Sequence, residues 1–317
     1  MGSVVISLDA ELGWGFHDLE TPPPHRVESG RRGWSHLLEL VERFDVPATW
    51  AVVGHLMLES CDGEHSAHPA PDGWFARERN EWRTRPDLRF GSDLVREILE
   101  ADTDHELASH SFSHVLFGDS ETTPELARAE LERSQEIAAE WGHTLESFVY
   151  PRNDVGHREE LASAGFRTYR GRSPTPDGVR GLVDSVVRDR SLLVQPTIDE
   201  HGLVNVPASL FLFGFEGPMR TVAESIWADP MVVQARRGID QAATQDGDGV
   251  FHMWLHPNNL CTDRDDERLY AILRHLARVR EETGLTVETM GDVGRRIADS
   301  SGKGSTRVPD PESYGLL

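Results

Sequence analysis

The chain has 317 residues and a formal net charge of −22, from 54 aspartates and glutamates against 32 lysines and arginines. Such an acidic surface repels nucleic acid phosphates and anionic lipid headgroups, which excludes nucleic acid as an expected partner. Lys303 is the only lysine. Acidic excess with so little lysine favours a halophilic protein from a very salty cytoplasm over an ordinary acidic surface encoded by GC-rich DNA.

Short apolar strands alternate with amphipathic helices along most of the chain. Apolar, β-branched runs predict strands at residues 4–8, 47–53, 106–109, 147–150, 166–170, 250–255 and 285–287. Apolar residues at helical spacing predict helices at residues 33–44, 92–100, 124–141, 157–164, 230–243, 265–283 and 290–297. This alternation is typical of a parallel sheet with helical crossovers, so we expect a single α/β domain with a TIM-like barrel.

Three segments depart from this alternation. Residues 55–91 are irregular, and we expect them to form a loop inserted over one mouth of the barrel. Residues 171–220 are also irregular, with strands suggested only near 183–187 and 203–206. The tail at 299–317 has few large apolar residues and is expected to be disordered. The predicted barrel domain therefore covers residues 1–298.

The cysteines and the apolar runs indicate the compartment. Cys61 and Cys261 are widely spaced and form no Cys-x-x-Cys pattern, so we expect free thiols rather than a disulfide or a thiolate cluster. The first residues lack the basic region of a signal peptide, and no run of 18 apolar residues occurs. We expect a cytoplasmic protein with no stable membrane insertion. Nothing in the pattern indicates the oligomeric state.

Acidic residues directly follow the first predicted strand. Asp9 and Glu11 are two positions apart, so on an extended segment their side chains share a face while Ala10 points away. A solvated acidic turn is the alternative interpretation. The carboxyl end of a buried strand, however, is where α/β folds commonly place their chemistry.

Two histidines follow a later strand in the same way. His110 and His114 lie beyond the strand at 106–109, and their spacing places both rings on one side of a helical turn. Two imidazoles and a carboxylate can hold one divalent ion. Chance also produces such pairs among 15 histidines. Five others are expected to be structural: His17, His55, His65, His68 and His252.

Four segments in this order resemble the motifs of the polysaccharide deacetylases, which are carbohydrate esterase family four with the nodulation-type deacetylase homology domain. The segments are Asp9-Ala10-Glu11, His110 with His114, Tyr150-Pro151-Arg152-Asn153 and Trp254-Leu255-His256. The resemblance covers about residues 3–298 and implies a distorted (β/α) barrel, usually seven-stranded. One departure stands out, because the common first motif has two adjacent aspartates where this chain has Asp9 and Ala10.

The resemblance implies a metal-dependent hydrolase that removes acetyl groups from N-acetylated sugars, acting on the carbon–nitrogen bond of an acetamide. It implies a divalent ion, Zn2+ or alternatively Co2+. The metal ligands carried over by position are Glu11, His110 and His114. The catalytic residues carried over are Asp9 as the base, His256 as the proton donor and Arg152 as the partner that keeps Asp9 ionised. Another motif, an Asp and Trp supporting the Arg, is matched only loosely by Trp227-Ala228-Asp229.

A cytoplasmic enzyme of this kind meets sugar precursors rather than finished polymer. We therefore expect a carbohydrate or sugar-precursor substrate and a role in the cytoplasmic steps of surface polysaccharide or glycan biosynthesis. Two alternatives stay open. The same metal site could hydrolyse a non-sugar amide or an O-acetyl ester, or the chain could be a non-catalytic sugar-binding protein that has lost its metal.

Overall fold

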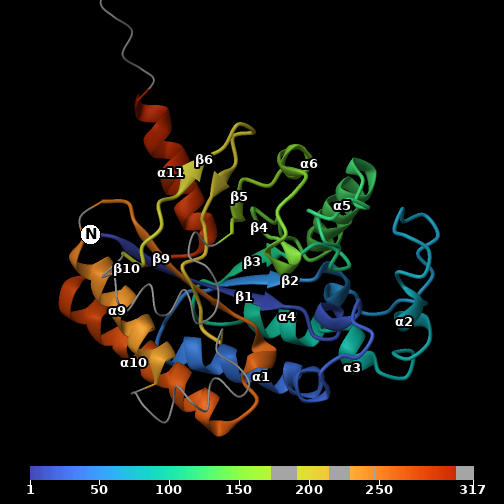
Figure 1. Cartoon of the computed structure of the whole chain (residues 1–317), viewed down its shortest axis with the longest axis horizontal. Coiled ribbons are helices and arrows are strands. Elements are labelled where there is room, and N and C mark those ends of the chain that lie inside the picture. Colours follow the sequence, from blue (N-terminus) through green and yellow to red (C-terminus); the bar gives the residue numbers. More distant parts are fainter. Residues whose placement is uncertain (173–190, 214–228, 246, 305–317) are drawn as a thin grey trace, which may run out of the picture.

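A single, mostly parallel sheet of ten strands runs through the centre of the molecule, with helices around it (Figure 1). The computed structural model describes residues 1–172, 191–213, 229–245 and 247–304. The strands are β1 (Ser3–Ala10), β2 (Thr49–Val52), β3 (Glu106–Ser109), β4 (Ser147–Val149), β5 (Thr168–Arg170), β6 (Thr197–Ile198), β7 (Val204–Asn205), β8 (Leu210–Phe211), β9 (Val250–Leu255) and β10 (Thr286–Val287). Their order is β6-β7-β5-β4-β3-β2-β1-β9-β8, with β10 also paired to β1.

The α-helices follow the strands in alternation. They are α1 (Pro24–Arg43), α2 (Ala76–Arg79), α3 (Pro86–Arg89), α4 (Ser92–Leu99), α5 (Pro124–Glu140), α6 (Arg158–Ser163), α9 (Pro230–Thr244), α10 (Asp263–Thr283) and α11 (Met290–Gly304). The described residues also contain four single turns of 3-10 helix, which are η1 (Trp14–Phe16), η2 (Gly54–Met57), η3 (Pro151–Asn153) and η4 (Pro257–Asn259). Three of these turns, η2, η3 and η4, begin within two residues of a strand's carboxyl end, where they position the side chains described below.

Every residue of β1 is buried, and β1 lies inside the sheet between β2 and β9. It pairs in parallel with β2 on one side and β9 on the other, so that Leu8 lies opposite both Trp50 and Leu255. Trp34 of α1 stacks on Trp50 at a ring distance of 5.6 Å, which anchors that helix on the sheet. Parallel pairing in this register brings the carboxyl ends of β1, β2 and β9 to the same edge.

The predicted α/β barrel fold is confirmed, as a curled sheet with more strands than the seven expected. The difference comes from β6, β7 and β8, which are each two residues long, whereas β10 lies within the strand predicted at 285–287. β3 and β9 have the predicted bounds. Of the strands suggested in the irregular segment, 203–206 contains β7, while 183–187 lies outside the described residues.

Two helices are longer than predicted. α1 begins at Pro24 rather than at residue 33. A proline is tolerated at the first position of a helix, because the backbone N–H group that it lacks would have no partner inside the helix. α11 continues to Gly304, seven residues beyond its predicted end at 297 and into the tail predicted at 299–317. Residues 305–317 lie outside the described residues. Along the described parts of the chain, no helix combines the length and apolar character needed to cross a membrane.

Candidate active site

The predicted acidic pair lies at the mouth of the sheet, in a pocket of about 340 Å³. Asp9 and Glu11 both line this pocket, and Ala10 is buried in the core on the other side, as their spacing predicted. The other walls come from segments that follow β3, β4 and β9 and from the segment after β1. Their lining residues include Phe16, Arg26, His114, Arg152, Asn153, Trp254, His256 and Asn258.

Glu11 lies against both histidines of the His110 and His114 pair. Its Oε2 atom is 3.5 Å from Nε2 of His110 and 3.2 Å from Nε2 of His114. These three donor atoms lie within 4.8 Å of one another, and all three side chains are buried. Burial acts to raise the pKa of Glu11, but His256 and the two histidines outweigh it and hold the pKa well below its usual value. An ionised carboxylate therefore faces two imidazole nitrogens.

The histidine loop does not form the helical turn that the spacing suggested. Ser111 and His114 have φ angles of 62° and 64°, so the chain twists sharply after β3 and no helix is present there. Glu130 of α5 is fully buried beneath the loop and accepts hydrogen bonds from the backbone N–H and the hydroxyl of Ser113. These hydrogen bonds to Glu130, rather than those of a helix, hold the loop in the conformation that brings the His110 and His114 rings together.

His110 is oriented by a backbone hydrogen bond. Its Nδ1 lies 2.8 Å from the carbonyl oxygen of Val149 in β4. Because a carbonyl can only accept, Nδ1 donates to it, and in the neutral form of the ring the lone pair of Nε2 points at Glu11. Nε2 is buried and makes no hydrogen bond. A bare, buried imidazole nitrogen facing a carboxylate is the arrangement that a divalent cation stabilises, so these residues fit a metal.

Arg170, at the carboxyl end of β5, is the partner that holds Asp9 ionised. Two of its nitrogens bond the two oxygens of Asp9 at 2.6 and 2.7 Å, and neither side chain is appreciably exposed. Burial acts to raise the pKa of Asp9, but the Arg170 charge, helped by His110 and His256, outweighs it and lowers the pKa. Asn153 accepts from the same guanidinium at 2.9 Å and fixes its plane.

The expected pairing of Arg152 with Asp9 is therefore wrong. Arg152 is on the pocket wall, but its guanidinium bonds Asp18 at 2.7 and 2.9 Å, and 40% of its side chain is exposed. The residue has a φ of 52°, which turns it away from the sheet interior. The signal for Arg170 was present in the sequence, since it ends the predicted strand at 166–170.

A buried network extends from Arg170 to His252, which the sequence suggested was only structural. Arg170 donates to the hydroxyl of Ser7 at 3.0 Å, and that oxygen lies 2.8 Å from Nε2 of His252. The Nδ1 atom of His252 faces the carbonyls of Val206 and Pro207 at 3.2 Å, so Nδ1 donates and Nε2 accepts. Burial, with the nearby Arg170 charge, lowers the pKa of His252 to about 3.

His256 lies across the pocket from the histidine loop, just beyond β9. Its Nε2 is 3.8 Å from Asp9 and 3.7 Å from Glu11. Asn259 holds its backbone N–H at 2.9 Å, and Asn258 donates to Glu11 at 3.3 Å. The Trp254 ring stacks on Phe211 at 4.2 Å and forms an aromatic wall beside His256.

Asp229, part of the loosely matched motif, lies elsewhere. It caps α9 by accepting from the backbone N–H of Met231, and it pairs with Arg268 of α10. Trp227 lies outside the described residues. The two cysteines are free thiols, as expected.

The fold and the pocket define an α/β barrel protein with a carboxylate and imidazole site at the carboxyl ends of its strands. Residues 23–169 match the family model described as polysaccharide deacetylase. This match confirms, over that part of the chain, the resemblance to polysaccharide deacetylases seen in the motifs. The matched range contains both loop histidines but not Asp9, Glu11, Arg170 or His256.

Solved structures support the fold. A putative polysaccharide deacetylase from Mycobacterium smegmatis is 16% identical, with a TM-score of 0.60 over 95% of this chain and 92% of that one. A probable polysaccharide deacetylase from Pseudomonas aeruginosa PAO1 is 15% identical, with a TM-score of 0.55 over 93% and 90%. The allantoinase PuuE is 14% identical, with a TM-score of 0.56 over 94% and 90%. No curated protein matches the chain.

Proposed function

We propose that the protein is a metal-dependent hydrolase that removes the acetyl group from an N-acetylated sugar. The observation that carries the proposal is the grouping of Glu11, His110 and His114 in one pocket with a paired, ionised Asp9. The match of residues 23–169 to the polysaccharide deacetylase model supports an acetyl amide as the substrate. The pocket volume is within the range of small-molecule sites.

Glu11, His110 and His114 would hold the ion. Three protein ligands leave a coordination position open, which is the pattern of catalytic rather than structural zinc sites, and cobalt fits the same donors. When bound, such an ion supplies a Lewis acid that polarises an acyl oxygen and acidifies water. Glu11 thus takes the ligand position that the second aspartate has in the common form of the motif.

The residues around that position divide the proton transfers between them. Asp9 accepts a proton from the attacking water, and Arg170 keeps Asp9 ionised for this purpose. His256 donates a proton to the departing nitrogen from the opposite side of the pocket. Arg152, paired with Asp18 on the pocket wall, contacts the substrate rather than Asp9. Trp254 offers an apolar face on which a sugar ring can stack.

A non-sugar amide is the second candidate substrate. The observation that favours it is the likeness of the fold to an allantoinase, a protein whose name points to allantoin rather than a sugar. For the first candidate, we propose that the substrate is a sugar precursor and that the reaction is a cytoplasmic step of glycan biosynthesis. Both parts of this proposal rest on the sequence alone.

Acetate release from UDP-N-acetylglucosamine, chitooligosaccharides and O-acetylated sugars, with allantoin hydrolysis in parallel, tests both candidates. The assays use high salt because of the charge of −22. Asp9→Asn should abolish turnover while the protein still binds cobalt, and His114→Ala should lose both. Asp93→Asn is the matched control, because this carboxylate pairs with Arg31 on the surface of α4. A fully active Asp9→Asn protein would contradict the assignment of the base.

A further inference from the structure

A second group of metal-ligating side chains lies in the inserted segment, apart from the candidate active site. His55 comes from η2, Cys61 and His65 from the loop after it, and Glu78 from α2. The Nε2 atoms of His55 and His65 are 3.0 and 2.9 Å from the Glu78 carboxylate, and Sγ of Cys61 is 3.5 Å from Nε2 of His65. All four donor atoms lie within 4.8 Å of one another.

The hydrogen bonds of His55 leave this group incomplete. Nδ1 of His55 lies 3.2 Å from the carbonyl oxygen of Arg89, so Nδ1 is a donor and Nε2 is the ring atom that faces Glu78. That nitrogen is fully buried and has no hydrogen-bond partner. At 3.0 Å from a buried carboxylate it needs a positive charge between the two atoms, which either a proton on the ring or a metal ion can supply.

We propose that His55, Cys61, His65 and Glu78 bind a second, structural metal ion of the zinc type. Two imidazoles, a thiolate and a carboxylate are donors that zinc takes in tetrahedral sites. Tetrahedral ligands at zinc bond lengths are roughly 3.3–3.8 Å apart. The contacts of 2.9, 3.0 and 3.5 Å need only small side-chain shifts to reach that spacing.

Arg89 holds two of the four proposed ligands in place. Its guanidinium bonds Glu78 and also donates to the carbonyl oxygen of Cys61 at 2.9 Å. A thiolate and a carboxylate give the ion two anionic ligands, and four protein ligands fill its coordination shell. A filled shell distinguishes this site from the three-ligand group at Glu11 and makes its role structural.

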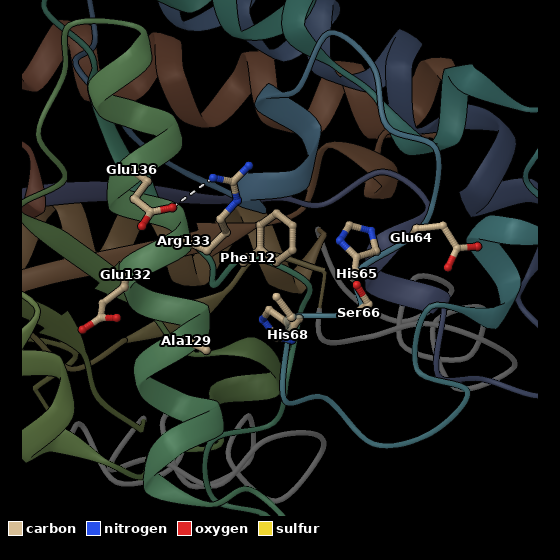
Figure 2. A pocket seen from close by; sticks show the side chains of 10 residues that line it. Glu64, His65, Ser66, His68, Phe112, Ala129, Glu132, Arg133 and Glu136 are labelled. Atoms are coloured by element: carbon tan, nitrogen blue, oxygen red, sulfur yellow. Dashed lines mark hydrogen bonds and ion pairs between the residues drawn. The ribbon is translucent and has the colours of Figure 1, made fainter.

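The position of the group shows what the ion would hold together. The ring of Phe112, between the two loop histidines, lies 5.6 Å from the His55 ring and 5.7 Å from the His65 ring. His55 also donates its backbone N–H to the carbonyl of Phe112 at 3.0 Å. Figure 2 shows Phe112 between His65 and Arg133 of α5 at the wall of a second cavity. The ion therefore fastens the insert onto the loop that carries His110 and His114.

Cobalt binding to the full-length protein tests the proposal. A Cys61 thiolate bound to cobalt absorbs in the near ultraviolet by charge transfer, and the Glu11, His110 and His114 group contains no sulfur. We expect two ions per chain and this absorption band in the wild type. Cys61→Ser should lose the band and one ion, whereas the control Cys261→Ser should keep both. Cys261 is the matched control because it is the other free thiol and contacts Ser29 instead.

His114→Ala separates this proposal from the proposed function. It should lose one ion, from the active-site group, and keep the charge-transfer band. A wild-type protein without the band at saturating cobalt overturns the second site, whether or not the protein releases acetate. A band with no acetate release supports the second site and contradicts the proposed deacetylase activity. The wild-type spectrum decides the question even if Cys61→Ser fails to fold.

Discussion

Replacing Arg170 with methionine should expose how strongly Asp9 depends on it. The change leaves a carboxylate that is 2% exposed without its two charged hydrogen bonds, and it also removes the donors to Ser7 and Asn153. Breaking one side of a buried ion pair costs about 3–5 kcal/mol, because the remaining charge stays uncompensated. Arg152→Met breaks a pair whose side chains are 40% and 21% exposed, so we expect about 0–1 kcal/mol.

A pair of double-mutant cycles measures the difference. Urea unfolding of the metal-free protein, followed by tryptophan fluorescence at pH 7 in high salt, gives the free energy of unfolding for each variant. Asp9→Asn combined with Arg170→Met should cost less than the two single changes together, by about 2 kcal/mol or more. Asp9→Asn combined with Arg152→Met should be additive within about 0.5 kcal/mol. The reasoning is refuted if Asp9 couples to Arg152 and is additive with Arg170.

Two further changes probe the metal group and the buried network. Gly15→Ala places a Cβ 2.1 Å from the carboxyl carbon of Glu11 and must displace that side chain. The affinity of the Glu11, His110 and His114 group for cobalt, measured by titration, should therefore fall about 10–100-fold. Unchanged affinity would show that Glu11 is no ligand. His252→Gln should flatten the pH dependence of stability. The pKa of His252 is about 3 in the native protein and near 6.5 in the unfolded chain. Between pH 6.5 and pH 3 the unfolded chain therefore binds more protons than the native protein, and the stability of the wild type falls as the pH is lowered. Between pH 7 and pH 5 the wild type should lose about 2 kcal/mol more than His252→Gln in urea unfolding; equal losses would contradict a neutral His252.

The elements with strong local patterns could be predicted from the sequence. β3 and β9 have the expected bounds because each is a short apolar run that ends at polar residues. The start of α1 could not be predicted, since three consecutive prolines also fit a loop and only packing against the sheet decides between them. The two-residue strands exist only through their partners in the sheet.

The candidate site also has a part that the sequence predicts and a part that it does not. Asp9 and Glu11 share a pocket because a two-residue spacing on an extended chain is a local property. Which arginine meets Asp9 is not local, because it depends on how far the sheet curls, and three strands separate β1 from β5. The group around Cys61 and His65 was missed for a related reason. Its ligands lie in an irregular segment whose geometry no periodic pattern predicts.

The ion pair between Asp9 and Arg170 joins residues that are 161 positions apart in the sequence. It connects the carboxyl ends of β1 and β5, which are not neighbours in the curled sheet. A contact of such long sequence separation carries a large loop-closure entropy cost, and in the folded sheet β2, β3 and β4 lie between the two strands that it joins. Before this contact forms, Asp9 is an ordinary carboxylate on a strand end. The ionisation of Asp9 inside the core is thus a product of tertiary closure, and its pKa would serve as a reporter of whether the barrel has finished folding.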